Sequence, residues 1–122
     1  MSRHPERAAD YLEHILDALD RIQRYTSDKS ESDFMADTIL QDAVLRNLGV
    51  VGEAARKLLA DAPEYVALHP EIPIAKINAT RNRIIHAYEE VDLDIIWNLL
   101  LYDVSILRPK IVDALSEFKG KD

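Results

Sequence analysis

Apolar residues recur at intervals of three and four along most of this chain, and that spacing constrains its fold more than any other feature. Residues spaced in this way share one face of an α-helix, whereas a half-buried strand alternates with a period of two. The first stripe predicts a helix from about residue 6 to residue 25, with charged residues on the opposite face. Its apolar members are Leu12, Ile15, Leu16, Leu19 and Ile22.

Two more stripes predict long helices. One helix is expected up to about residue 60, after a polar linker at residues 26–33 and with a possible break near Thr38; its stripe is Leu40, Val44, Leu48, Val51, Ala55 and Leu58. The other is expected from Leu93 to about Phe118, with the stripe Trp97, Leu100, Val104, Leu107, Ile111 and Ala114. Pro109 predicts a kink near Ser105, because its ring clashes with the carbonyl four residues earlier.

Prolines separate these helices. Three prolines between residues 62 and 73 exclude a continuous helix there. Pro73 suits the first position of a further helix, expected to end near Tyr88, and Asp92 is expected to cap the last helix. No segment has the strand period. The sequence therefore predicts one all-α domain over residues 1–122, an up-and-down bundle of four to five helices.

Two glycines fall inside the second long helix. Gly49 and Gly52 each cost about 1 kcal/mol relative to alanine in a helix interior. Such a cost predicts that another helix packs very close at these positions, and simple tolerance of the two residues is the alternative.

Composition and short motifs exclude several classes of function. The chain has no cysteine, which excludes disulfides, thiolate catalysis and cysteine-based zinc sites. It has neither a long uninterrupted apolar run nor an apolar block at the N-terminus, so we expect a cytoplasmic protein without a membrane span. The net charge of −7 argues against a general nucleic-acid coat protein. No histidine follows a glutamate by three residues, and no phosphate-binding glycine loop is present, so no metal or cofactor is expected.

One segment departs from the acidic character of the chain. Residues 72–88 contain none of the 22 acidic residues and carry Lys76, Arg81, Arg83 and His86. A phosphate-bearing ligand would be attracted to this segment and repelled by most other surfaces. The alternative is a helix that pairs with an acidic neighbour in the bundle.

Arg81 and His86 suit metal-free RNA cleavage. A histidine can remove the proton of a ribose 2′-hydroxyl near neutral pH, and a guanidinium can stabilise charge on the phosphate. On a regular helix, however, these two side chains point about 140° apart. They can converge by the reach of the side chains, by loosening of the helix near its end, or across a dimer axis. We expect a two-fold axis in a homodimer to bring them together.

The sequence from Arg81 to Tyr88 resembles the Arg, four residues, His, one residue, Tyr motif of HepT-like toxins, which belong to the HEPN ribonuclease superfamily. Two other blocks extend the resemblance: residues 42–55 are similar to the family's long second helix, and Val91 to Trp97 with Pro109 to its closing segment. The resemblance covers nearly the whole chain from Leu12.

The resemblance implies a homodimeric, metal-independent endoribonuclease toxin with an RNA substrate. Arg81 and His86 would be catalytic, with Asn82 and Arg83 in support. Tyr88 would be modified with AMP by a cognate nucleotidyltransferase antitoxin of the MntA type, and the ATP and magnesium would belong to that partner. The competing functions are a non-catalytic helical adaptor for a nucleotidyltransferase, and a structural dimer without a ligand.

Each site residue also has a simpler interpretation. Arg81 could pair with Glu53 or Glu89, His86 could cap a helix C-terminus, and Tyr88 could be a packing residue with an exposed hydroxyl. Glu53 is a candidate for supporting the active site, and a structural ion-pair set with Arg46 is the alternative.

Overall fold

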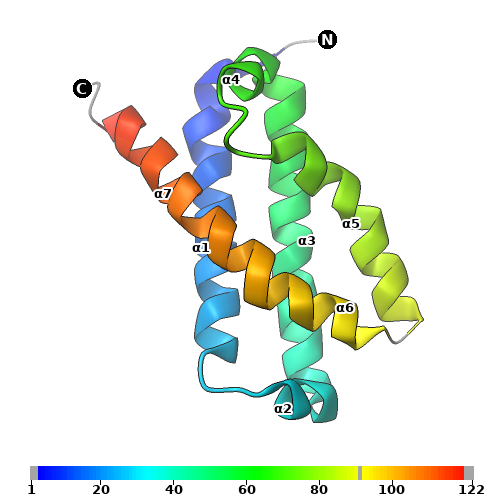
Figure 1. Ribbon diagram of the computed structural model, residues 1–122. Coiled ribbons are helices and arrows are strands. Elements are labelled where there is room, and N and C mark those ends of the chain that lie inside the picture. Colours follow the sequence, from blue (N-terminus) through cyan, green and yellow to red (C-terminus); the bar gives the residue numbers. More distant parts are fainter. Residues whose placement is uncertain (1–2, 91, 120–122) are drawn as a thin grey trace.

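A computed structural model describes residues 3–90 and 92–119, and these residues are mostly helical (Figure 1). No strand occurs within that part of the chain, so the all-α prediction is confirmed. The elements in chain order are η1 (Pro5–Arg7), α1 (Ala8–Thr26), α2 (Glu31–Ala36), α3 (Thr38–Asp61), α4 (Pro63–Leu68), α5 (Ile74–Glu89), α6 (Leu93–Asn98), the π-helical segment η2 (Leu99–Val104) and α7 (Ser105–Lys119).

The long helices alternate in direction, as an up-and-down bundle requires. α1 and α3 lie side by side and antiparallel, and α5 packs against α3 (Figure 1). The elements α6, η2 and α7, which we call the C-terminal arm, run diagonally across this layer. Within this arm, it is α7 that packs against α1. The short connection between α4 and α5, residues 69–73, returns the chain so that α5 lies beside α3.

The predicted apolar stripes form the core. Burial of each large aliphatic side chain contributes about 1.5–3 kcal/mol to stability. Leu16 is only half-buried, while the other members of the first stripe are buried. Every member of the second and third stripes is buried as predicted.

The break near Thr38 is real. α2 begins with a capping box in which Ser30 and Asp33 each bond the other's backbone N–H. α2 ends at Ala36, and the carboxylate of Asp37 then accepts a hydrogen bond from the Leu40 amide at 3.1 Å. Asp37 therefore caps α3 and sets its direction.

Three details differ from the sequence prediction. Residues Pro63–Leu68 form the short helix α4, because a proline is tolerated in the first turn, where its missing N–H is not needed. Asp92 occupies the N-cap position of α6 as predicted, but its side chain makes no cap hydrogen bond. Pro109 lies within α7. Just before Ser105, the α-helical hydrogen-bonding pattern is replaced by that of the π-helical segment η2.

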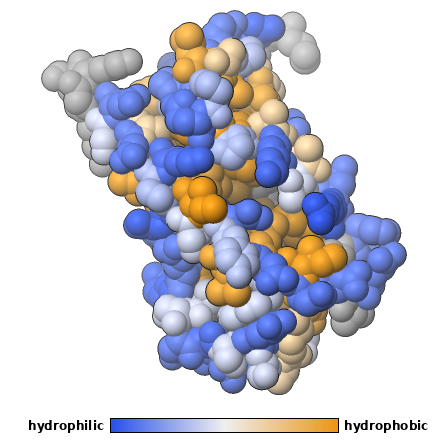
Figure 2. Space-filling view, in the orientation of Figure 1, coloured by the Kyte–Doolittle hydropathy of each residue, from blue (hydrophilic) through white to orange (hydrophobic). Residues whose placement is uncertain are grey.

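The visible surface is largely hydrophilic, with apolar atoms exposed between α5 and the C-terminal arm (Figure 2). Within the described residues, no helix combines the length and the hydropathy needed to cross a membrane.

Candidate active site

α5 carries all the residues of the predicted motif. Pro73 precedes it, Ile74 is buried at its start, and Ile77 and Ile84 pack against the core, which fixes its rotation on α3. The helix ends at Glu89, so the motif occupies its last two turns.

Arg81 lies against α3 at a glycine. A Cβ atom built on Gly52 would be 3.1 Å from Cγ and Cδ of Arg81 and 3.2 Å from its Cβ, so a side chain at position 52 would require Arg81 to shift. This confirms the predicted close approach of another helix at Gly52. At Gly49 nothing lies within 4 Å of such an atom, so the same prediction is wrong there.

A carboxylate between two arginines holds the Arg81 guanidinium. Nη1 of Arg81 donates to Oε2 of Glu53 at 2.9 Å, and Arg56 donates to the same carboxylate from Nε and Nη2. The hydrogen bonds from Arg56, followed by the charges of Arg56 and Arg81, lower the pKa of Glu53. The partner of Glu53 on α3 is Arg56, one turn later, rather than Arg46. A single ion pair leaves Arg81 with several N–H donors for a ligand.

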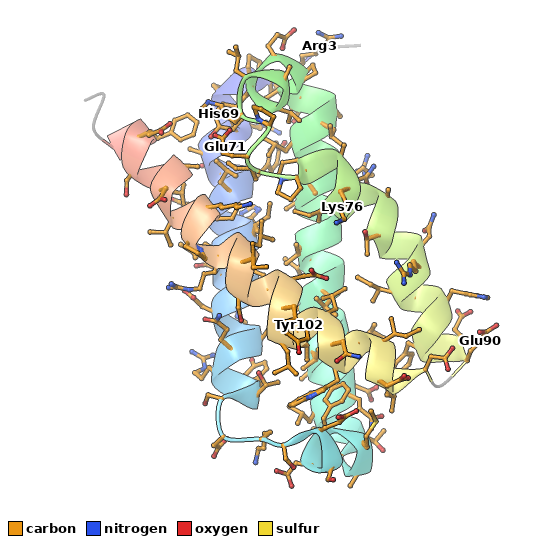
Figure 3. All side chains as sticks on the ribbon, viewed as in Figure 1. Arg3, His69, Glu71, Lys76, Glu90 and Tyr102 are labelled. Carbon is orange, nitrogen blue, oxygen red and sulfur yellow. The ribbon has the colours of Figure 1, made fainter. Side chains whose placement is uncertain are left out.

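His86 is exposed and points away from Arg81. Its side chain is 71% exposed. Nε2 of His86 lies 3.1 Å from Oε1 of Glu90, which is four residues later in the sequence. Glu90 marks the end of α5 in Figure 3. His86 does not line the groove that Arg81 lines, so the structure does not bring the two together within one subunit.

Tyr88 and Arg81 do share a groove, as the spacing of seven residues predicts. This groove between α3 and α5 has a volume of about 330 Å³ and is also lined by Asp42, Arg46 and Gly49. The half-buried Tyr88 donates its hydroxyl proton to Oδ1 of Asp42. That hydrogen bond, together with desolvation, raises the pKa of Tyr88 above its ordinary value of 10.0.

The two supporting candidates on α5, Asn82 and Arg83, are exposed. Arg83 lines a second hollow between α5 and the C-terminal arm rather than the Arg81 groove. Within the described residues, no cluster of three or more histidine, aspartate or glutamate side chains is arranged to hold a metal ion.

Comparison with known proteins identifies the family of this chain. The sequence profile described as "Ribonuclease HepT-like" matches residues 15–114, which include α3, α5 and most of the C-terminal arm. The chain belongs to the ribonuclease HepT-like family. The family assigned from the motif is thereby confirmed.

Relatives of this HepT-like chain carry ribonuclease names. A protein of Thermococcus cleftensis described as "Probable ribonuclease HepT" is 37% identical over 101 residues, which cover 83% of this chain and 89% of the relative. A Methanocaldococcus jannaschii protein described as "Gamma-glutamylcyclotransferase and putative RNase" is 35% identical over 107 residues, 88% of this chain but 47% of that longer protein. No solved structure shows a significant match to the HepT-like chain.

Sequence reasoning missed three hydrogen-bond or ion-pair partners of the candidate site residues. Asp42 binds Tyr88, Arg56 binds Glu53, and Glu90 binds His86. The spacing of Glu90 from His86, four residues on one helix, was a readable signal. Asp42 could not be paired with Tyr88 from the sequence, because their contact depends on how α3 and α5 pack.

Proposed function

We propose that this HepT-like chain is an endoribonuclease that cleaves RNA without a metal ion, with Arg81 and His86 as its catalytic residues. The observation that carries the proposal is the placement of Arg81. Its aliphatic carbons pack against Gly52, its guanidinium is bound by Glu53, and the residue lines a groove. An exposed histidine, His86, follows within the same acid-free segment, residues 72–88. Family membership and the names of the relatives support the same reaction.

The chemistry needs one base and one cation. His86 would accept the proton of a ribose 2′-hydroxyl through Nδ1, while Glu90 binds Nε2 and stabilises the imidazolium that forms. The 2′-oxygen then attacks phosphorus, and the bond from phosphorus to the 5′-oxygen breaks. The 5′-oxygen takes a proton from water, and the imidazolium of His86 returns its proton to the solvent. The products are a 2′,3′-cyclic phosphate and a 5′-hydroxyl end. Arg81 would stabilise the added charge on the phosphate, and Asn82 would help to orient the phosphate or His86.

The catalytic residues would meet in a homodimer. Arg81 and His86 diverge by about 140° on one helix, and each is accessible to solvent. A two-fold axis beside α5 would place the Arg81 of one subunit near the His86 of the other. Mixing an Arg81→Ala variant with a His86→Ala variant tests this arrangement: heterodimers that contain one intact pair should regain cleavage. No recovery after subunit exchange would refute the shared site.

Tyr88 would be the point of control in a toxin–antitoxin pair. Its hydroxyl lies at the Arg81 groove, and a cytoplasmic nucleotidyltransferase antitoxin would transfer AMP to it. The added nucleotide would fill much of a groove of about 330 Å³ with negative charge and so exclude RNA. Intact-mass measurement after co-expression with such a partner should show AMP additions that are absent from the Tyr88→Phe variant.

The decisive experiment is cleavage of RNA in the presence of a chelator. The wild type should release cyclic phosphate ends, and His86→Ala should abolish cleavage while the thermal unfolding curve stays unchanged. His14→Ala is the matched control, because His14 is an exposed histidine on α1. Retained cleavage by His86→Ala would refute the role of His86. A wild type that binds a nucleotidyltransferase but cuts no RNA would instead indicate an adaptor.

A further inference from the structure

A second groove runs along the other side of α5, where α5 faces the C-terminal arm. It consists of two adjoining hollows of about 360 and 380 Å³, each within the size range of ligand pockets. The two hollows share lining residues and are therefore continuous; the shared residues are Lys76, Thr80, Ile84, Leu99 and Asp103. Ile84 also lines the Arg81 groove, so α5 forms the wall between the two grooves.

This second groove carries cations that have no ion-pair partner within the part of the chain that the structure describes. Among the described residues, no carboxylate lies within ion-pair distance of Lys76 or Arg83, whereas Arg81, Arg56 and Arg108 each have one. Both free cations line the hollow nearer the end of α5. Asp103 is the acidic residue that lines it. The local charge is therefore positive on a chain whose net charge is −7.

An exposed aromatic ring stands on the opposite wall. Tyr102 is 64% exposed and lies in the π-helical segment η2, on the same face of the molecule as Lys76 (Figure 3). Tyr11 and Tyr88 bind aspartates, and the Tyr65 ring stacks on Phe118, but within the described residues Tyr102 has neither a hydrogen bond nor a stacked ring. π-helical segments are rare and occur frequently at functional sites.

Cations beside a free aromatic face fit single-stranded RNA. Phosphates bind to spaced basic side chains, and a base stacks on the ring. Helix geometry also connects this groove with His86. Arg83 precedes His86 by three residues, so the two side chains diverge by only about 60° and are neighbours on the surface of α5.

We propose that the groove between α5 and the C-terminal arm binds a single-stranded segment of the RNA substrate and leads it to His86. Lys76 and Arg83 bind phosphates, and one base stacks on Tyr102. This inference rests on the proposed ribonuclease function and adds the surface that holds the substrate.

Binding of a fluorescently labelled, short single-stranded RNA, measured by anisotropy, tests the proposal. The His86→Ala variant serves as the parent, so that the RNA stays intact. Tyr102→Ala should weaken binding by about 5- to 150-fold, which is the loss of one stacked base, and Tyr102→Phe should bind like the parent. Lys76→Gln and Arg83→Gln should each reduce the slope of log affinity against log salt by about 0.7. Arg21→Gln makes the same charge change on the exposed side of α1 and should leave the slope unchanged.

The outcomes separate this inference from the ribonuclease proposal. Unchanged affinity of Tyr102→Ala and of Lys76→Gln would overturn the RNA groove, even where the wild type cleaves RNA. If Tyr102→Ala instead changes the sedimentation coefficient without changing RNA affinity, a second copy of the chain covers the groove and the inference is also overturned. Absence of cleavage by the wild type would count against the catalytic proposal alone, because binding is measured separately. Far-UV circular dichroism confirms that each variant is folded.

Discussion

Replacing Gly52 with alanine tests how Arg81 is positioned. Alanine gains about 1 kcal/mol over glycine in a helix interior. At position 52, however, the new Cβ would lie 3.1 Å from two carbons of the Arg81 side chain and 3.2 Å from its Cβ. These distances are below the optimum of about 3.5–4.0 Å for carbon atoms. Because the Cβ of Arg81 is fixed by the α5 backbone, rotation of the side chain cannot relieve every contact.

Gly49 provides the matched comparison on the same helix. A Cβ there meets nothing within 4 Å, so Gly49→Ala should raise the free energy of unfolding by about 1 kcal/mol, or roughly 3–5 °C in Tm. Gly52→Ala should be no more stable than the wild type, because overpacking costs of about 1–3 kcal/mol offset the gain. It should also displace the Arg81 guanidinium from Glu53.

Urea denaturation and NMR of arginine side-chain N–H groups measure the two effects. In Gly52→Ala the Arg81 resonance should shift, whereas in Gly49→Ala it should remain in place. Equal stabilisation of both variants with an unchanged Arg81 resonance would refute the close approach at Gly52. This result does not depend on whether the protein cleaves RNA.

Three further outcomes follow from the site. The pKa of Glu53 is lowered by Arg56 and Arg81, so its stabilisation is present above its ordinary pKa of 4.5 and is lost as pH falls through the folded value. The difference in unfolding free energy between wild type and Glu53→Gln should therefore be largest at neutral pH and shrink in acid; a pH-independent difference would contradict the ion pair. Asp42→Asn should return the raised pKa of Tyr88 toward 10.0, measured by NMR of ring-labelled tyrosine with Tyr88→Phe for assignment, and no change would exclude the hydrogen bond as its cause. Arg81→Lys keeps the charge but loses the planar fork, so cleavage should slow roughly 10²-fold; a wild-type rate would show that a point charge suffices.

Most of the fold was predictable because it follows from local rules. The stripes at spacings of three and four identify the buried faces, and Pro73 and the polar linker indicate where the long helices begin. The exceptions are short segments in which the residues are compatible with more than one local structure. The sequence does not distinguish the short helix α4 from a loop with prolines, nor does it show that the irregularity before Ser105 is the π-helical segment η2.

The candidate site was predictable in its residues but not in its partners. The acid-free stretch and the motif identify Arg81, His86 and Tyr88, and the seven-residue spacing places Arg81 and Tyr88 in one groove. Asp42 and Arg56 could not be assigned as partners, because a contact between helices depends on their relative rotation and offset. Gly52 is a signal of helix contact that the sequence does contain.

The amino-acid sequence by itself determined the helical class, the buried stripes and the helix that carries the motif, because each depends on residues a few positions apart. Only the tertiary structure decided that Glu53 holds Arg81, that Asp42 holds Tyr88, and that a second, cationic groove lies on the other side of α5. The physical reason is that these features join side chains from different helices. Their positions are set by the packing of the whole core, not by local spacing along the chain.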